Sequence, residues 1–169
     1  EGVGGDVEVS ESSLVQLGSC LNRASTWNPL RASADDLFRY IDLSSVDQDN
    51  KAISDAREVA CRDAPSRARQ LVATGDVLVS TVRPNLNGVA RVPSELDGAT
   101  ASTGFCVLRP EPKKLDSSYL FQWVKSSAFI SDMVSKATGA SYPALSDRII
   151  FESEIPLPPL EEQRRIAAI

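Results

Sequence analysis

Residues 75–110 carry the clearest pattern of hydrophobic and polar positions in the chain. GDVLVSTV (75–82) contains a continuous apolar run of strand length, and NGVARV (87–92) overlaps the end of the turn-rich stretch RPNLNG. Two such strands around a turn are typical of a hairpin. STGFCVLRP (102–110) predicts a third strand, which Pro110 and Pro112 end because proline has no amide hydrogen for the ladder.

The segments before residue 75 have a weaker pattern. Residues 13–25 indicate a short strand that runs into a turn or short helix. Residues 38–51 indicate a strand followed by an exit loop rich in Ser, Asp and Asn. Between 55 and 75 the pattern is ambiguous: Ala and Arg favour helix, Pro65 interrupts it, and a short helix over 66–72 is predicted.

The hydrophobic period becomes helical between residues 115 and 137. Two apolar stripes are separated by a Ser-Ser break, and they consist of Leu120, Trp123 and Val124, then Ile130, Met133, Val134 and Ala137. Asp116 suits the N-cap of the first helix, and Ser126 or Ser127 that of the second. We therefore predict two packed helices.

The C-terminal part gives loop, strand and helix signals in turn. Residues 138–146 are punctuated by Gly and Pro, residues 147–157 are strand-like, and Pro158 or Pro159 suits the first turn of a last helix. The pattern as a whole predicts an α+β fold. It has a mixed, largely antiparallel twisted sheet, two packed helices and a C-terminal helix that leaves the domain.

Composition places the chain among ordinary globular proteins. Of its 169 residues 42% are hydrophobic and 24% charged, which suits one domain with its own core. No run of about 18 apolar residues occurs and the N-terminus lacks a signal pattern, so we expect a cytoplasmic protein without membrane insertion. Residues 1–12 open with EGVGGD rather than Met, and we expect them to be disordered or left from cloning.

Cysteine and histidine usage narrows the possible chemistry. Cys20, Cys61 and Cys106 are widely spaced, which fits reduced, buried thiols better than a disulfide framework or a zinc site. The chain contains no histidine. This absence excludes Ser-His-Asp and Cys-His catalytic systems and every metal site that contains histidine. The hypothesis that the chain is an enzyme loses much of its support.

The charge is unevenly distributed along the sequence. The net charge is −5, which argues against a protein that binds nucleic acid over its whole surface. From Arg57 to Arg91, however, there are six arginines against three acidic residues, a local balance of +3. A localised basic face on an acidic domain is consistent with this pattern.

Three stretches, in this order, resemble one family. TGDVLVSTVRPNLNGVA (74–90), TGFCVLRP (103–110) and TGASYPALSDRIIFESEIPLPPLEEQRRIAAI (138–169) look like a target recognition domain from the DNA-specificity subunit of type I restriction-modification enzymes. The likeness covers residues 67–169 well and the earlier part weakly. Its most specific piece is 155–166.

The resemblance implies a non-catalytic protein that recognises double-stranded DNA sequence-specifically. In that family such a domain reads one half of a split target and directs other subunits to it. Those partners are methyltransferase (modification) subunits, which act on adenine N6, and an ATP-dependent restriction/translocase subunit. S-adenosylmethionine, ATP and Mg²⁺ would belong to the partners, and we expect no cofactor in this chain.

The resemblance also implies a division of the chain. Residues 1–157 would form the recognition domain, and residues 158–169 would start a spacer helix that holds a second recognition domain or pairs with a second copy. We expect Ile166 and Ile169 of this helix to pack on the domain or on a neighbouring copy.

Candidate DNA contacts follow from side-chain chemistry and position. Arg83 can donate two hydrogen bonds to a guanine edge or bind a phosphate, while asparagine amides match adenine. Ordinary turn chemistry and solvated surface arginines are the simpler explanations of the same residues. The candidates are Arg67, Arg69, Arg83, Asn85, Asn87, Lys136, Thr138, Ser141 and Tyr142.

Two alternatives remain at this point. Asp97, Glu111 and Lys113 have the loose spacing of a magnesium-dependent nuclease, in which paired carboxylates hold the ion. Pro110 and Pro112 bracket Glu111, however, which is a poor setting for a catalytic strand residue. A protein-binding adaptor would also fit the net charge of −5 and the terminal helix.

Overall fold

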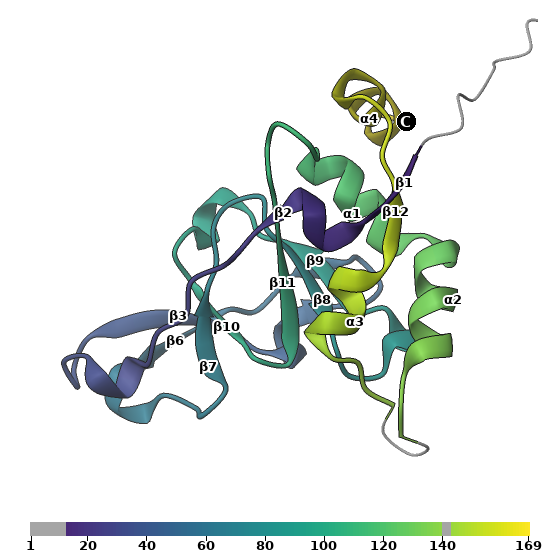
Figure 1. The fold of residues 1–169 in the computed structure, drawn as a ribbon. Helices are drawn as coiled ribbons and strands as arrows, with labels where there is room; N and C mark the ends of the chain where they lie inside the picture. Colours follow the sequence, from purple (N-terminus) through teal and green to yellow (C-terminus); the bar gives the residue numbers. More distant parts are fainter. Residues whose placement is uncertain (1–12, 140–142) are drawn as a thin grey trace, which may run out of the picture.

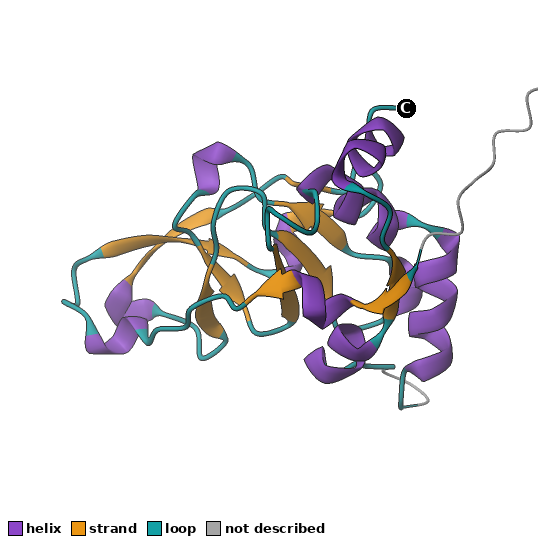
Figure 2. Cartoon of the chain, turned by 45° about the horizontal axis from the view of Figure 1, so that its top comes forward, coloured by secondary structure: helices purple, strands orange, loops and turns teal. Residues whose placement is uncertain are grey.

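Two four-stranded sheets form the body of the protein in a computed structural model (Figures 1 and 2). The structure describes residues 13–139 and 143–169. The first sheet has the order β6-β3-β10-β7, with β3 and β10 parallel and the other pairs antiparallel. Its strands are β3 (Leu37–Ile41), β6 (Arg57–Ala60), β7 (Ala68–Leu71) and β10 (Thr100–Ser102).

The second sheet is antiparallel and has the order β2-β11-β8-β9. Its strands are β2 (Leu21–Asn22), β8 (Val77–Ser80), β9 (Val89–Arg91) and β11 (Phe105–Pro110). Val77 pairs with Arg91 and Val79 with Val89, so the predicted hairpin is confirmed. The third predicted strand is also confirmed, since Cys106 of β11 pairs with Val79 of β8.

Side chains of β8 alternate between two cores. Val77 and Val79 pack with the helices, whereas Leu78 packs between the two sheets with Ala101 and Phe105. Successive side chains of a strand point to opposite faces, so a strand covered on both faces is apolar throughout. This explains why the segment 77–79 carries no polar residue.

Within the described residues, two short two-stranded ribbons and six single-turn 3-10 helices complete the connections. The first ribbon, β1 with β12, brings the described N-terminal segment against the C-terminal one, because Val15 pairs with Ile155. The ribbon strands are β1 (Leu14–Gln16), β12 (Glu154–Pro156), β4 (Val46–Asp47) and β5 (Ala52–Ile53). The 3-10 turns are η1 (Leu17–Cys20), η2 (Pro29–Arg31), η3 (Leu43–Ser45), η4 (Cys61–Asp63), η5 (Pro84–Leu86) and η6 (Ser94–Leu96).

The two predicted helices are confirmed as α1 (Ser117–Lys125) and α2 (Ser127–Lys136). Asp116 accepts a hydrogen bond from the amide of Tyr119, and Ser126 from that of Phe129, so both are N-caps. The buried faces of both helices belong to the core against the second sheet. Val134 is an exception, because it was expected on this face and is exposed.

The expected strand over 147–157 is mostly wrong. Residues 147–152 form the helix α3 (Asp147–Glu152), and only Glu154–Pro156 is a strand. The Ser146 side chain accepts the amide of Ile149 and begins the helix, which buries Ile150. A short apolar run does not distinguish one buried helical turn from a strand.

The short helix predicted over 66–72 is also wrong, because Ala68–Leu71 forms the edge strand β7. Leu71 pairs with Thr100 and Gln70 with Ala101 of β10. The Gln70 amide additionally donates to the carbonyls of Ser102 and Phe105 at 2.9 and 2.8 Å. Pairing with a distant strand therefore overrides the local helix preference of Ala and Arg.

The last helix, α4 (Leu160–Ala167), docks on the domain instead of leaving it. Pro159 is its N-cap, and Gln163 in its middle is 0% exposed. The Gln163 side chain accepts from the amide of Asp116 and donates to the carbonyls of Lys114 and Pro158. The helix is thus bonded to the segment that begins α1.

The expected burial of the isoleucines in α4 is not found on this domain. Ile169 is fully exposed and Ile166 is 42% exposed. The helix is fixed through Gln163, and this leaves the C-terminal turn projecting at the top of Figure 1.

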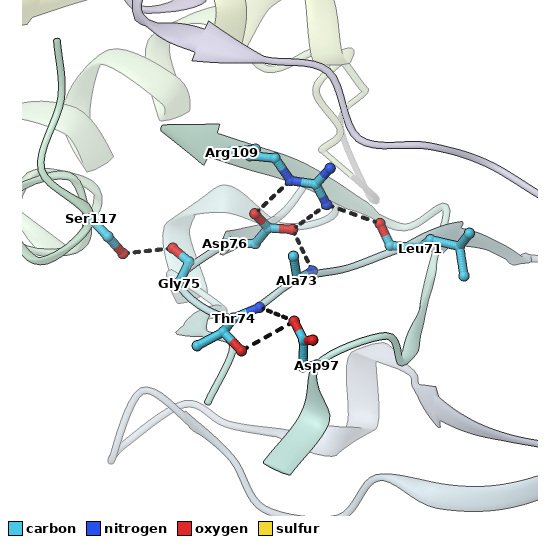
Figure 3. Close-up of polar contacts among 8 residues, drawn as sticks. All are labelled: Leu71, Ala73, Thr74, Gly75, Asp76, Asp97, Arg109 and Ser117. Carbon is cyan, nitrogen blue, oxygen red and sulfur yellow. Dashed lines mark hydrogen bonds and ion pairs between the residues drawn. The ribbon is translucent and has the colours of Figure 1, made fainter. Parts of the chain in front are cut away.

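A corner built from the TGD and LRP motifs joins the two sheets (Figure 3). The buried Asp76 carboxylate, 1% exposed, accepts two hydrogen bonds from Arg109 of β11, at 3.0 and 2.9 Å. It also accepts the amide of Ala73, while Arg109 donates to the carbonyl of Leu71 at the end of β7. The hydrogen bond to Asp76 raises the pKa of the Arg109 guanidinium. These family-like motif residues therefore build the fold.

The three cysteines are buried and free, as the sequence predicts. Burial, together with the nearby Asp147, raises the pKa of the Cys106 thiol far above its usual range. Cys106 is therefore held as a neutral thiol inside the core. Among the described helices, none combines the length and apolar character that a membrane span requires.

Candidate nucleic-acid interface

The three segments nominated for DNA contact meet along one edge of the molecule. The β10–β11 turn links the first two segments. Its Thr103 donates its amide to the carbonyl of Arg67, and the carbonyl of its neighbour Gly104 accepts the amide of Thr81 after β8. The chain after β8 is bonded in turn to the α2–α3 connection, since Arg83 donates its amide to the carbonyl of Pro143 at 2.8 Å. Figure 1 shows the end of β8 toward the lower edge of the molecule.

The loop of residues 83–88, hereafter loop 83–88, carries two of the exposed candidates on this edge. It contains the single turn η5 and returns the chain from β8 to β9. Arg83, Asn85 and Leu86 are exposed. Pro84 is buried beneath them. The loop thus presents a guanidinium, an amide and an apolar side chain on a buried base.

Asn87 is not available to a base edge, contrary to the sequence-based expectation. Its side chain is 8% exposed, and its amide donates to the carbonyl of Val124 at the end of α1, at 2.9 Å. The reason is its left-handed backbone, φ 47°, which turns the side chain back toward the helices. We therefore leave Asn87 out of the proposed contact surface.

Lys51 is a residue of this site that the sequence did not reveal. Its ammonium donates to the backbone carbonyl of Asn87 at 2.6 Å, across a separation of 36 residues. The β4–β5 hairpin that carries Lys51 thereby supports loop 83–88. No motif or period in DQDNK (47–51) signals such a contact, because it joins two turns that are distant in sequence.

The two arginines before and within β7 differ in exposure. Arg67 is exposed next to the β10–β11 turn. Arg69 is half-buried and donates one guanidinium hydrogen bond to the carbonyl of Ala68 at 3.1 Å. Neither lies in the predicted helix, because Arg67 belongs to the turn before β7 and Arg69 to the strand itself. Arg67 is the better placed of the two for a phosphate.

The α2–α3 connection contributes two described candidates. Lys136 ends α2 and forms an exposed ion pair with Asp132 at 3.0 Å. Thr138 is exposed, and its backbone pairs with that of Ala144, which also bridges to Val82 after β8. This pairing holds the connection against loop 83–88. Ser141 and Tyr142 lie outside the described residues.

A hollow of about 290 Å³ opens beside loop 83–88. Its lining includes Arg83 and Leu86 of the loop together with Leu43 and Val46 of the η3–β4 segment. Gly88 also lines it, and an added Cβ there would lie 3.3 Å from the Cβ of Ser80. The edge is therefore concave next to its exposed arginine.

The nuclease alternative gains no support from the placement of its residues. Asp97 accepts the amide and hydroxyl of Thr74, and Glu111 accepts the amide of Lys113 two residues ahead at 2.8 Å. Glu111 thus closes a local turn, and Asp97 ties the chain after η6 to the turn before β8. Within residues 13–139 and 143–169, no group of three or more His, Cys, Asp or Glu side chains is arranged to hold a metal ion.

Comparisons with known proteins identify the class of protein to which this fold belongs. Residues 70–169 match the family model of the type I restriction modification DNA specificity domain. The chain belongs to this family. The match begins in β7 and includes loop 83–88, the Asp76–Arg109 corner and α4.

Two curated relatives are specificity subunits. The chain is 24% identical over 110 residues to the type I restriction enzyme HindI specificity subunit of Haemophilus influenzae. It is 29% identical over 105 residues to the EcoDI specificity subunit of Escherichia coli. These matches cover 64% and 62% of this chain but 24% and 22% of the relatives. The chain thus corresponds to a part of each subunit.

Solved structures extend the likeness over nearly the whole chain. The HsdS subunit from Thermoanaerobacter tengcongensis is 38% identical with a TM-score of 0.87, covering 95% of this chain and 41% of that one. A chain from a type I R-M system, solved to explain complex assembly and conformational transition, is 37% identical with a TM-score of 0.88. The S subunit from M. genitalium, at 13% identity and a TM-score of 0.55, shares the fold alone.

Proposed function

We propose that this chain is a target recognition domain that binds double-stranded DNA sequence-specifically through the edge around loop 83–88. The observation that carries the proposal is the convergence of three separate segments, each with an exposed polar or basic side chain, on that edge. Membership of the DNA specificity domain family supports it. In a chain with a net charge of −5, the excess of arginines over acidic residues from Arg57 to Arg91 also favours a polyanionic partner.

Each described candidate has a role that its position allows. Arg83 is proposed to bond a guanine edge in the major groove, with Asn85 beside it on an adenine. Arg67, Arg69 and Lys136 are proposed to contact phosphates, and Thr138 to add a neutral hydrogen bond to the backbone. Ser141 and Tyr142 remain candidates from their chemistry. Phosphate contacts would position the domain, and base contacts would specify the sequence.

The proposed partners follow from the relatives, which are named specificity subunits of type I restriction enzymes. We propose that this chain reads one half of a split target in the cytoplasm and directs modification and restriction subunits to it, without catalysis of its own. S-adenosylmethionine, ATP and Mg²⁺ are assigned to those partners. The chain covers 41% of the HsdS subunit, which leaves length there for a second domain of this size.

The proposed division of the chain places the recognition domain in 1–157 and the start of a spacer in 158–169. The buried Pro158 and the N-cap Pro159 separate β12 from α4 and support this boundary. Docking through Gln163 would give the spacer a defined direction relative to the DNA-binding edge. Pairing with a second domain or a second copy would then cover Ile166 and Ile169.

Alanine substitution of Arg83 and of Asn85 tests the DNA-binding edge. Each change is expected to weaken binding to the preferred duplex by about 1–3 kcal/mol, because a base edge loses its partner. Binding to unrelated duplexes should change less. The measurement is fluorescence anisotropy with the assembled specificity–modification complex, on a duplex selected from a random pool.

Arg91→Ala is the matched control, since Arg91 is an exposed arginine at the opposite end of the same hairpin. It should leave selective binding unchanged. Equal affinities for the selected duplex in the wild type and in both edge variants would refute the assignment of loop 83–88.

Arg67→Ala should act differently from the loop variants. A lost phosphate contact weakens binding to all duplexes alike and lowers the slope of log affinity against log salt concentration by about 1. Anisotropy titrations at several salt concentrations measure this slope. A loss confined to one DNA sequence would instead place Arg67 on a base.

A further inference from the structure

The left-handed residues other than glycine gather around one contact in the described chain. Outside glycine, positive φ occurs at Lys51 (52°), Arg83 (49°) and Asn87 (47°) among the residues that the structure describes. Such conformations are uncommon for residues with a side chain, and they cluster at functional sites. Arg83 and Asn87 flank η5, and the ammonium of Lys51 is bonded to Asn87.

Loop 83–88 is held at its C-terminal end from two sides. The carbonyl of Asn87 accepts Lys51 Nζ at 2.6 Å and the amide of Val89 at 3.0 Å. The side-chain amide of Asn87 donates to the carbonyl of Val124. The β4–β5 hairpin and the end of α1 thus fix the residue that closes the loop, while Arg83 and Asn85 stay exposed.

The bond from Lys51 is made at the expense of some hydration of its ammonium. Desolvation by burial lowers the pKa of the Lys51 ammonium, the neighbouring Lys125 lowers it further, and Asp49 opposes them. The fold therefore holds this cation where its charged form is less favoured than in water. It also holds Lys51 in a left-handed conformation that glycine would adopt more readily.

We propose that Lys51 is a positioning residue for DNA recognition, fixing the carbonyl of Asn87 and thereby the directions of Arg83 and Asn85. The inference rests on the proposed function of loop 83–88. A loop ordered before binding loses less conformational freedom when it meets DNA, so pre-organisation appears as affinity. Lys51 acts through the loop and need not touch DNA.

Lys51→Met tests the inference because methionine keeps most of the apolar stem and removes the ammonium. In the assembled complex, affinity for the selected duplex should fall about tenfold, the effect of one charge-assisted hydrogen bond. The salt slope should stay unchanged, whereas a direct phosphate contact would lower it by about 1. Without DNA, amide hydrogen exchange in residues 85–89 should accelerate about tenfold, because the bond that restrains the loop is gone.

Lys114→Met is the matched control. Lys114 also donates to a backbone carbonyl, that of Ser19 at 3.2 Å, and its loss changes the net charge equally. It should affect neither loop exchange nor selective binding. Lys51→Gly is a second variant, since glycine relieves the left-handed strain and keeps the turn folded while the ammonium is lost. It should reproduce both effects of Lys51→Met.

The outcomes separate this inference from the proposed function. Unchanged loop exchange and unchanged affinity in both Lys51 variants would overturn the positioning role, even if Arg83→Ala abolishes selective binding. A reduced salt slope would overturn it in favour of a phosphate contact. Faster loop exchange, with DNA binding insensitive to Arg83, Asn85 and Lys51 alike, would retain the structural support of the loop but refute its role in recognition.

Discussion

Asp76→Ala is expected to lower the free energy of unfolding by about 3 kcal/mol. The change removes the partner of Arg109, whose side chain is 26% exposed, and leaves the amide of Ala73 without its acceptor. A guanidinium stripped of its carboxylate in this setting is only partly rehydrated. Urea denaturation followed by circular dichroism measures the loss.

Asp97→Ala provides the control for this corner. Asp97 also accepts two hydrogen bonds in the same turn region, from Thr74, but it is exposed and bonds to no cation in Figure 3. Its loss should cost less than about 1 kcal/mol, because water replaces the lost partner. If both variants lose the same amount, the buried ion pair does not hold the corner.

Gln163→Leu is expected to cost about 2–4 kcal/mol of unfolding free energy. Leucine has a similar volume but provides neither donor nor acceptor. The amide of Asp116 and the carbonyls of Lys114 and Pro158 would lose their partners at a site where Gln163 is fully buried. Thermal denaturation measures the global effect, and amide exchange in residues 158–169 measures undocking of α4.

Arg165→Ala is the companion variant on the same helix. Arg165 is exposed, so its removal should change stability by no more than about 0.5 kcal/mol. A Gln163→Leu protein as stable as Arg165→Ala, with slow exchange in α4, would show that apolar packing alone docks the helix.

These predictions bear on how the family-like motifs are understood. Asp76 of TGD, Arg109 of LRP and Gln163 of PLEEQRR are all buried or half-buried and bonded to the protein itself. Their hydrogen-bonding capacity is directed inward. The edge proposed to bind DNA uses different side chains, and this separation lets one scaffold carry different exposed residues.

Sequence patterns predicted the elements whose signals are local. The β8–β9 hairpin, β11 and the two capped helices were predicted because apolar period, turn residues and N-caps all agree there. The segments 66–72 and 147–152 were predicted wrongly. In the first segment, pairing with β10 decides the structure. In the second, the apolar run of a short capped helix has the same sequence pattern as a buried strand.

The candidate site could be predicted only in part for the same reason. Arg83 and Asn85 in loop 83–88 are exposed, as turn chemistry suggests, whereas Asn87 of the same turn is directed to α1. Two asparagines two residues apart look alike in a sequence. They differ in the structure because Asn87 has a left-handed backbone and its side-chain amide donates to the carbonyl of Val124 at the end of α1.

The terminal segment IPLPPLEEQRRIAAI shows the division most clearly. By itself the sequence determined where a helix begins, through prolines and acidic residues at its start, and which family the chain resembles. Only the tertiary structure decided that Gln163, and not Ile166 or Ile169, is buried. The reason is that backbone groups just before α1 need hydrogen-bond partners, and Gln163 supplies them. These groups lie nearly fifty residues from Gln163 in the sequence, so the local pattern of α4 cannot predict the contact.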